Sequence, residues 1–314
     1  MKLKSLLVNP EKKIILLIVL LLVVFSLSKI PSVVSWGNAS NYKNYSVRTT
    51  VNVTNSYPEI LNVSCNNGTS FTLNAGTTKT IDCIVEIRDY NGWNDINYAN
   101  ATFYYYLNES SDPNDNNEHY TNGSCINTSN DGQYLANWTC SFDVWHYAFN
   151  GTWEVNSTVN DSYGAQDNDY GNATIDALLA LNVTPVINFG NMAVTDTSTS
   201  SEQANITNFG NVDINVTVFG FGGDDVVSGA GFAMLCEQRN LTLPNERFDL
   251  SSATGYAAMT KISGIANQTG LTVIRQTNDS QQEINATYWR LHINLTTNPF
   301  GICNGTVVFS AESP

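Results

Sequence analysis

The sequence predicts an all-β protein with two β-sandwich domains in tandem, preceded by a hydrophobic signal or anchor helix. Short stretches of alternating apolar and polar residues recur after residue 35, and turn-forming residues separate them. Alternation with a period of two is typical of strands that bury one face. Many short strands without convincing amphipathic helices between them favour sandwiches over a βαβ fold. The 314 residues are enough for about two domains of ordinary size.

Residues 1–35 have the layout of a secretory signal peptide. Lysines precede an apolar run from Ile14 to Ser28, and Lys29 and a stretch of mostly small residues follow it. The run of about 15 residues would form roughly 22 Å of helix, which is shorter than the ~30 Å hydrocarbon core of a bilayer. We therefore expect export, with cleavage near Ser35. A retained N-terminal anchor is the alternative, and it would be the chain's one contact with a membrane.

The expected exported part of the chain is acidic. Residues 36–314 carry 9 basic and 27 acidic side chains, which gives a net charge of −18. Such a surface repels phosphate backbones, so we expect no nucleic-acid partner.

Four alternating segments define the expected first domain, residues 45–180. They are residues 80–89, 100–107, 137–144 and 148–161. In the first of them, Ile81, Cys83, Val85 and Ile87 share one face. Residues 45–53 also alternate, and we expect them either as the first strand of this domain or as a strand that pairs with the open sheet edge of a neighbouring molecule.

The expected second domain, residues 181–314, follows a crossing segment at 171–185. Its strand candidates are residues 212–218, 287–295 and 305–310. The letters NFGN occur at 188–191 and again at 208–211, each time near a turn. We interpret the two copies as a shared Asn-Gly turn geometry rather than as a repeat architecture.

All six cysteines follow the predicted signal segment, which indicates disulfides formed in an oxidising compartment. Four precede the expected domain boundary and two follow it, so three connectivities are open. We favour the one in which two pairs close loops of hairpin size, each contributing about 3 kcal/mol in the chain-entropy model. The favoured pairs are Cys65–Cys83, Cys125–Cys140 and Cys236–Cys303. A Cys83–Cys140 bond across the two sheets is the alternative.

Asparagine-linked glycosylation is predicted from an excess of acceptor triplets. The chain contains 42 Asn and 58 Ser plus Thr residues, and random placement would give about eight Asn-x-Ser/Thr triplets. The sequence has 23. The candidate acceptors, on polar faces of strands or in turns, are Asn100, Asn137, Asn150, Asn156, Asn215 and Asn294. We also expect Asn160, where a strand runs out, to be accessible to solvent.

Two segments resemble immunoglobulin-like domains of exported archaeal and bacterial surface proteins. They are DYNGWNDI at 89–96, a turn that ends a core strand, and FNGTWEVNSTVND at 149–161, a Gly-Thr-Trp strand that ends in Asp. The resemblance covers about residues 50–180, and the second domain is more loosely similar to surface-layer and adhesion-associated sandwiches. The resemblance implies immunoglobulin-like folds for the domains. Together with the acceptor triplets, the resemblance favours an archaeal cell-surface protein.

An acidic cluster is the best candidate for a binding site. If the Gly-Thr-Trp strand is the sixth of an immunoglobulin-like domain, Asp89 and Asp161 end strands whose loops share one tip. Asp95, Asp167 and Asp169 are expected in the same loops. Several carboxylates that converge with Asn carbonyls suit Ca²⁺, which takes six to eight oxygen ligands. Solvated turn residues are the alternative, and we expect no other cofactor.

The sequence offers no catalytic motif. His119, His146 and His292 are its histidines, and they form no HExxH spacing; no Gly-x-Ser-x-Gly motif occurs either. We therefore expect a protein that is not an enzyme. Tyr104 and Tyr106 are expected to share an outward face, where their rings could stack on sugars or pair across strands.

These expectations combine into a heavily N-glycosylated, non-catalytic structural or adhesion protein of the cell surface, as a component of an envelope or a filament. The alternative is a carbohydrate- or Ca²⁺-dependent extracellular binding module. The expected partners are other surface proteins, glycans, or further copies of the chain joined by sheet-edge or strand addition.

Overall fold

The computed structural model describes residues 46–279 and 282–314. The predicted signal or anchor at residues 1–35 lies outside this range. The chain divides into two compact units, residues 1–53 and 54–314, and the second unit contains all the described strands. In the part of the chain that the structure describes, no helix is both long and apolar enough to cross a membrane.

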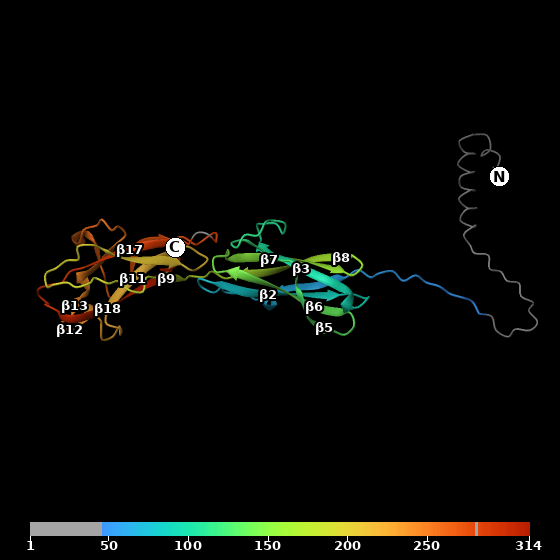
Figure 1. The fold of residues 1–314 in the computed structure, drawn as a ribbon, viewed down its shortest axis with the longest axis horizontal. Helices are drawn as coiled ribbons and strands as arrows, with labels where there is room; N and C mark the ends of the chain where they lie inside the picture. The colour runs from blue at the N-terminus through green and yellow to red at the C-terminus, as the bar shows by residue number, and fades with distance from the viewer. Residues whose placement is uncertain (1–45, 280–281) are drawn as a thin grey trace, which may run out of the picture. The chain divides into compact units, whose positions relative to one another are not determined.

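The predicted all-β class is confirmed, because the helices among the described residues are 3₁₀ turns of three residues each. The first half of the unit forms two four-stranded antiparallel sheets, visible in blue and green in Figure 1. One sheet contains, in spatial order, β1 (Glu59–Cys65), β2 (Thr78–Arg88), β6 (Leu135–Trp145) and β5 (Ile126–Asp131). The other contains β4 (His119–Asn122), β3 (Ile96–Tyr105), β7 (Gly151–Asp161) and β8 (Gln166–Ile175).

Aromatic side chains join these two sheets into one core. Phe103 of β3 stacks on Trp153 of β7 with ring centroids 4.7 Å apart, and it contacts Phe142 of the opposite sheet at 5.5 Å. Trp153 and Phe103 are fully buried. Burial of one such side chain stabilises a fold by about 1.5–3 kcal/mol. Phe103 belongs to the alternating segment predicted at residues 100–107, although the last residue of that segment, Leu107, is exposed because β3 ends at Tyr105.

The second half of the unit forms two five-stranded sheets. One contains β15 (Thr260–Lys261), β14 (Glu246–Asp249), β17 (Ile284–Leu291), β10 (Glu202–Asn208) and β9 (Leu181–Val183). The other links β13 (Leu241–Thr242), β12 (Phe232–Gln238), β18 (Phe300–Glu312), β11 (Ile214–Gly222) and β16 (Asn267–Val273). Each described sheet is formed either by strands from β1 to β8 or by strands from β9 to β18, and no sheet mixes the two sets.

The core of this second sandwich centres on Trp289 of β17, which is fully buried. Its ring lies 5.3 Å from that of Phe248 in the same sheet and 5.9 Å from that of Phe309 in β18 of the opposite sheet. The indole N–H donates to the hydroxyl of Thr287 at 2.8 Å, which satisfies its one polar atom.

Both NFGN copies make the same Asn-to-Gly hydrogen bond, but they do not share the predicted turn geometry, because Gly190 has a φ of 69° and Gly210 does not have a positive φ. The Oδ1 atom of Asn188 accepts a hydrogen bond from the Gly190 N–H at 2.9 Å, and Asn208 accepts one from Gly210 at 2.8 Å. Only the second copy is buried. A Cβ atom on Gly210 would lie 2.0 Å from the carbonyl oxygen of Leu178, so glycine is required where the connection between the sandwiches passes.

Residues 46–58 form no strand, which corrects the expectation that residues 45–53 begin the first domain. The first strand is β1, and it starts only at Glu59. Val47, Val51 and Val53 are exposed by 84%, 85% and 83%. Their alternation therefore has no partner sheet within the described part of this chain.

Candidate metal centre

Three of the five predicted aspartates meet at one tip of the first sandwich. Asp89 directly follows β2, Asp95 closes the 3₁₀ turn before β3, and Asp161 is the last residue of β7. β3 and β7 are neighbours, and Ile96 pairs with Asp161 at their shared end. One carboxylate oxygen from each of the three aspartates lies within 4.8 Å of the others.

The turns at this tip follow from local hydrogen bonds of the aspartates themselves. Oδ1 of Asp89 accepts the N–H of Asn91 at 2.7 Å, and Gly92 follows with a φ of 121°. Oδ1 of Asp161 accepts the N–H groups of Tyr163 at 2.9 Å and Ala165 at 2.8 Å. These are the side-chain-to-backbone bonds for which Asp is favoured in turns.

The second oxygens of the cluster are buried and incompletely satisfied. Oδ2 of Asp89, Oδ2 of Asp95 and Oδ1 of Asn55 accept no hydrogen bond within the described residues. Asp89 is completely buried. Burial raises the pKa of Asp89, the charges of Asp95 and Asp161 raise it further, and the hydrogen bond from Asn91 partly opposes them. A cation at this tip would offset the repulsion among the three carboxylates.

The donor set fits a hard cation. Every side-chain atom named here as a candidate ligand is an oxygen, and Ca²⁺ takes six to eight oxygens from carboxylates, amide carbonyls, backbone and water. Asp89, Asp95 and Asp161 would supply carboxylate oxygens, and Asn55 would supply an amide oxygen. The described group contains no His or Cys, the ligands that Zn²⁺ sites prefer.

Asp167 and Asp169 do not belong to this group, which corrects their predicted place in the loop. β8 begins at Gln166, so both residues lie within that strand. Oδ2 of Asp167 accepts the N–H of Ile60 at 2.8 Å, and Oδ1 of Asp169 accepts that of Tyr170. Asn55 was missed by the sequence analysis, because nothing in its own neighbourhood marks it as a partner of Asp161.

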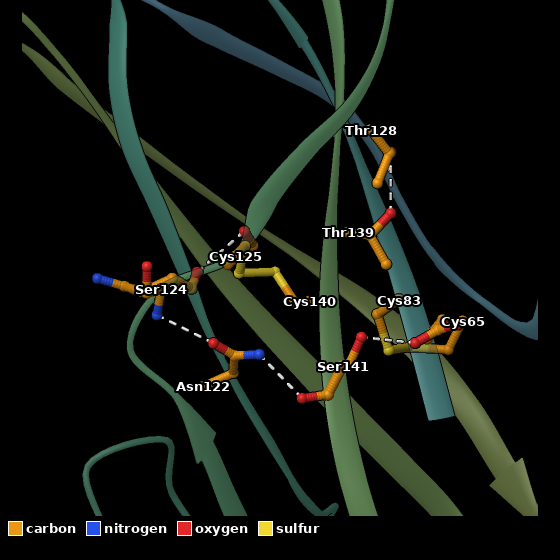
Figure 2. Close-up of a disulfide and its surroundings, with 12 residues drawn as sticks. Cys65, Cys83, Asn122, Ser124, Cys125, Thr128, Thr139, Cys140 and Ser141 are labelled. Atoms are coloured by element: carbon orange, nitrogen blue, oxygen red, sulfur yellow. Dashed lines mark hydrogen bonds between the residues drawn. A yellow bond between two sulfur atoms is a disulfide. The ribbon is translucent and has the colours of Figure 1, made fainter. Parts of the chain in front are cut away.

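The structure joins the cysteines in the favoured pairing. The bonds are Cys65–Cys83, Cys125–Cys140 and Cys236–Cys303. The alternative Cys83–Cys140 bond does not form. These two residues face each other on the neighbouring strands β2 and β6 rather than on opposite sheets, and each sulfur bonds elsewhere. Figure 2 shows the two resulting disulfides near one another, with Ser141 and Asn122 hydrogen-bonded beside them.

The predicted glycan acceptors are less exposed to solvent than the sequence suggested. Asn100, Asn137, Asn150, Asn156, Asn215 and Asn294 are all half-buried. Asn160 is only 8% exposed, so the expectation that it is accessible is wrong. It lies near the end of β7, between its pairing partners Tyr98 of β3 and Gln166 of β8.

The expected pair of outward tyrosines is not available as a sugar platform. Tyr104 is only 3% exposed, because its ring stacks on His119 at 5.9 Å and its hydroxyl donates to Glu154 at 3.0 Å. Tyr106 is 47% exposed and lies beyond the end of β3. His146 is buried against Tyr147 and Phe209, and neither of its ring nitrogens has a hydrogen-bond partner among the described residues.

The sequence matches no protein-family profile and no curated protein. Among solved structures, one of the carbohydrate-binding modules of the β-sandwich superfamily aligns with 83% of this chain and 99% of its own, at 10% identity and a TM-score of 0.24. A DUF4466 family protein from Parabacteroides merdae aligns with 76% of this chain and 100% of its own, at 11% identity and a TM-score of 0.25. The C-terminal domain of the AgI/II polypeptide BspA from Streptococcus agalactiae covers 82% of this chain and 96% of its own, at 10% identity and a TM-score of 0.23. Such low TM-scores do not establish a shared fold, so the β-sandwich assignment rests on the strand pairing and cores described above.

Proposed function

We propose that this chain is an exported, non-catalytic structural or adhesive protein of the cell exterior, whose first sandwich is stabilised by Ca²⁺ at the Asp89 tip. The observation that carries the calcium part is the convergence of buried carboxylate oxygens that lack hydrogen-bond partners. Buried, unpaired carboxylates cost free energy in a folded protein unless a cation or donor satisfies them.

Support for an extracellular location comes from the cysteines and the N-terminal sequence. All six cysteines are disulfide-bonded, and disulfides persist in oxidising compartments. Lysines followed by an apolar run match a secretory signal. The proposal includes immunoglobulin-like character for both sandwiches, as the sequence resemblance implies, together with N-linked glycans on the acceptor triplets and an archaeal cell surface.

Calcium suits this location because its concentration outside cells reaches the millimolar range where weak extracellular sites fill, with Kd of about 10⁻⁴–10⁻³ M. At ten times its Kd, a ligand that binds only the folded state stabilises it by about 1.4 kcal/mol. The ion would also hold together the ends of β2, β3 and β7, which approach the tip from both sheets.

Calcium titration of the exported protein tests the proposal. We expect isothermal titration calorimetry to detect Ca²⁺ binding, and the melting temperature to rise by several degrees between EDTA and 5 mM CaCl₂, on the scale of about 1–2 kcal/mol. Asp89→Asn should abolish both responses while leaving the protein folded, because the amide keeps the oxygen that accepts from Asn91. Asp169→Asn is the matched control, since Asp169 is exposed and outside the cluster. Equal melting temperatures in EDTA and calcium, with no heat of binding, would refute the calcium site.

A further inference from the structure

The second sandwich has a sheet edge that lacks a strand. β18 pairs with β11 over Gly305–Glu312 and with β12 only over Phe300–Asn304. No other described strand pairs with Gly305–Glu312. In an antiparallel sheet, alternate residues direct their N–H and C=O groups to opposite sides of the strand. Every second residue of Gly305–Glu312, here called the free edge, therefore directs its backbone groups away from β11 to a side without a partner strand.

Core-facing side chains are left partly uncovered along the free edge. Val307 and Phe309 lie opposite Gly220 and Val218 of β11 and pack against the core, as their register requires. They are nevertheless only half-buried, whereas Val218 is fully buried on the neighbouring strand. A further strand beside β18 would cover them.

A groove lined by both apolar and polar side chains follows the free edge. It has a volume of about 500 Å³ and runs between β18 and residues 183–187. Its lining includes Ile187, Met234, Val307 and Phe309, together with the carboxylate side chain of Glu246. Glu246 is 3% exposed, and this burial raises the pKa of its carboxyl group to about 8. A second hollow of about 460 Å³ shares Ile187 and Met234 with the first and lies beside residues 301–304, the part of β18 that pairs with β12.

The chain also contains a segment with the pattern that such a groove requires. Residues 46–53 form no strand and are exposed along their whole length. In an extended conformation Val47, Thr49, Val51 and Val53 would share one face. The segment has eight residues, the same number as the free edge. Thr49 supplies a hydroxyl on the apolar face, which matches the single carboxylate in the groove.

Residues 46–53 cannot fill the groove of their own chain. Asn55 and Ser56 are held at the Asp161 tip by hydrogen bonds of 2.6 Å to Asp161 and Asn91. From this tip, β8 runs ten residues, or ~33 Å, to Ile175 before the chain continues to the second sandwich. Eight extended residues span about 27 Å, so the segment ends before it has passed the first sandwich. The occupant must come from a second copy.

We propose that residues 46–53 of one copy add as a strand to the free edge of the next copy, with Val47, Val51 and Val53 over the groove. Main-chain hydrogen bonds between the added strand and β18 would provide the binding affinity, and the valines would fix the register of the added strand against β18. Such a contact joins two different surfaces, so repeated copies form an open chain rather than a closed dimer. The inference rests on the proposed structural function, but calcium binding at the Asp89 tip is measured separately, so either can fail alone.

Assembly of the exported protein tests the proposal. We measure its mass by size-exclusion chromatography with light scattering over rising concentration, and image it by negative-stain electron microscopy. Linear oligomers are expected. Val51→Asp should weaken assembly at least about tenfold, because it removes one valine that assembly would bury and places a charge over the half-buried Val307 and Phe309. Thr50→Asp introduces the same charge on the opposite face and should assemble like the wild type. Both positions are exposed in the single copy, so neither change threatens the fold.

A synthetic peptide of residues 45–54 provides an independent readout. We expect it to bind the Val51→Asp protein and to slow hydrogen–deuterium exchange specifically at β18. The same peptide with Asp in place of Val51 should do neither. A wild-type protein that stays monomeric and leaves β18 exchange unchanged when peptide is added would overturn the proposal. Equal assembly of the Val51→Asp and Thr50→Asp proteins would overturn it as well.

Discussion

The side chain of Asn55 donates a hydrogen bond of 2.6 Å from Nδ2 to Oδ2 of Asp161, 106 residues further along the chain. The same aspartate closes the turn between β7 and β8 through Tyr163 and Ala165. One carboxylate therefore fixes both the end of a core strand and the residues that precede the first strand. Any cation bound at the tip would share its ligands with this clamp.

Loss of the Asp161 side chain should destabilise the protein even without calcium. Asp161→Ala removes an acceptor of three hydrogen bonds, and hydrogen bonds to a charged group contribute about 1.5–3 kcal/mol each without being additive. We expect the free energy of unfolding in EDTA to fall by about 3 kcal/mol or more in urea titrations. Asp169→Ala should change it by less than about 0.5 kcal/mol. Equal values for the two variants would contradict the role given to Asp161.

Glu246 should make stability depend on pH in a direction unusual for a carboxylate. Burial raises its pKa from 4.5 to about 8. The folded chain keeps the proton up to about pH 8, whereas the unfolded chain releases it near pH 4.5. The free energy of unfolding therefore falls as pH rises through this window, by up to ~1.4 kcal/mol per pH unit. Glu246→Gln should remove the slope, so that the variant exceeds the wild type at pH 8 and equals it at pH 4.5. Parallel pH profiles for the two proteins would contradict this.

The alternation of side chains was enough to predict the long strands β2, β3, β6 and β7 and their buried faces, but not the shorter strands β1, β4 and β5 or the order of strands in the sheets. Every second residue of a strand points to the same face, and the buried face of β2 carries Ile81, Cys83, Val85 and Ile87. The pattern could not predict which side chains on the polar face of a strand would be covered by a segment distant in sequence. Tyr104 lies on the face that alternation assigns to solvent, yet the neighbouring strand β4 covers it with His119.

The acidic site was predicted in outline for the same reason. Asp89 and Asp161 follow apolar strands directly, so their place at strand ends can be deduced from the sequence. Asp167 and Asp169 were misplaced because the start of β8 is polar and carries no hydrophobic signal. Asn55 lies in a segment without regular structure, and only the folded chain brings it to Asp161.

The three disulfides should differ in their resistance to reduction of the native protein. Cys65, Cys83 and Cys140 are completely buried and Cys125 is 4% exposed, whereas Cys236 and Cys303 are half-buried beside the groove. Mild phosphine reductant followed by iodoacetamide should therefore label Cys236 and Cys303 first, as mass spectrometry would show. Loss of this bond should lower the free energy of unfolding by about 4 kcal/mol, since it closes the longest of the three loops. Initial labelling of Cys125 and Cys140 would contradict this order.

His146 should weaken the fold in mild acid. Burial lowers its pKa, and both ring nitrogens lack a hydrogen-bond partner among the described residues. The unfolded chain therefore takes up a proton at a higher pH than the folded chain. The free energy of unfolding should fall as pH drops below about 6.5. His146→Phe keeps an aromatic ring against Tyr147 and Phe209 and should abolish this contribution. If the difference between the two proteins is the same at pH 7.5 and pH 5, the prediction is wrong.

Occupancy of the glycan acceptors should follow their exposure in the folded chain. Asn160 is 8% exposed, whereas Asn67 and Asn127, which also begin acceptor triplets, are exposed. A glycan on Asn160 would have to displace the turn that Asp161 holds, so modification there competes directly with the clamp to Asn55. Glycopeptide mass spectrometry of protein from its own host should find Asn67 and Asn127 modified and Asn160 bare. High occupancy at Asn160 would mean either that glycans attach before this turn forms or that the tip opens in the native protein. The Asp161→Ala variant separates these two explanations. It should raise the occupancy of Asn160 only if the closed turn protects this residue from modification.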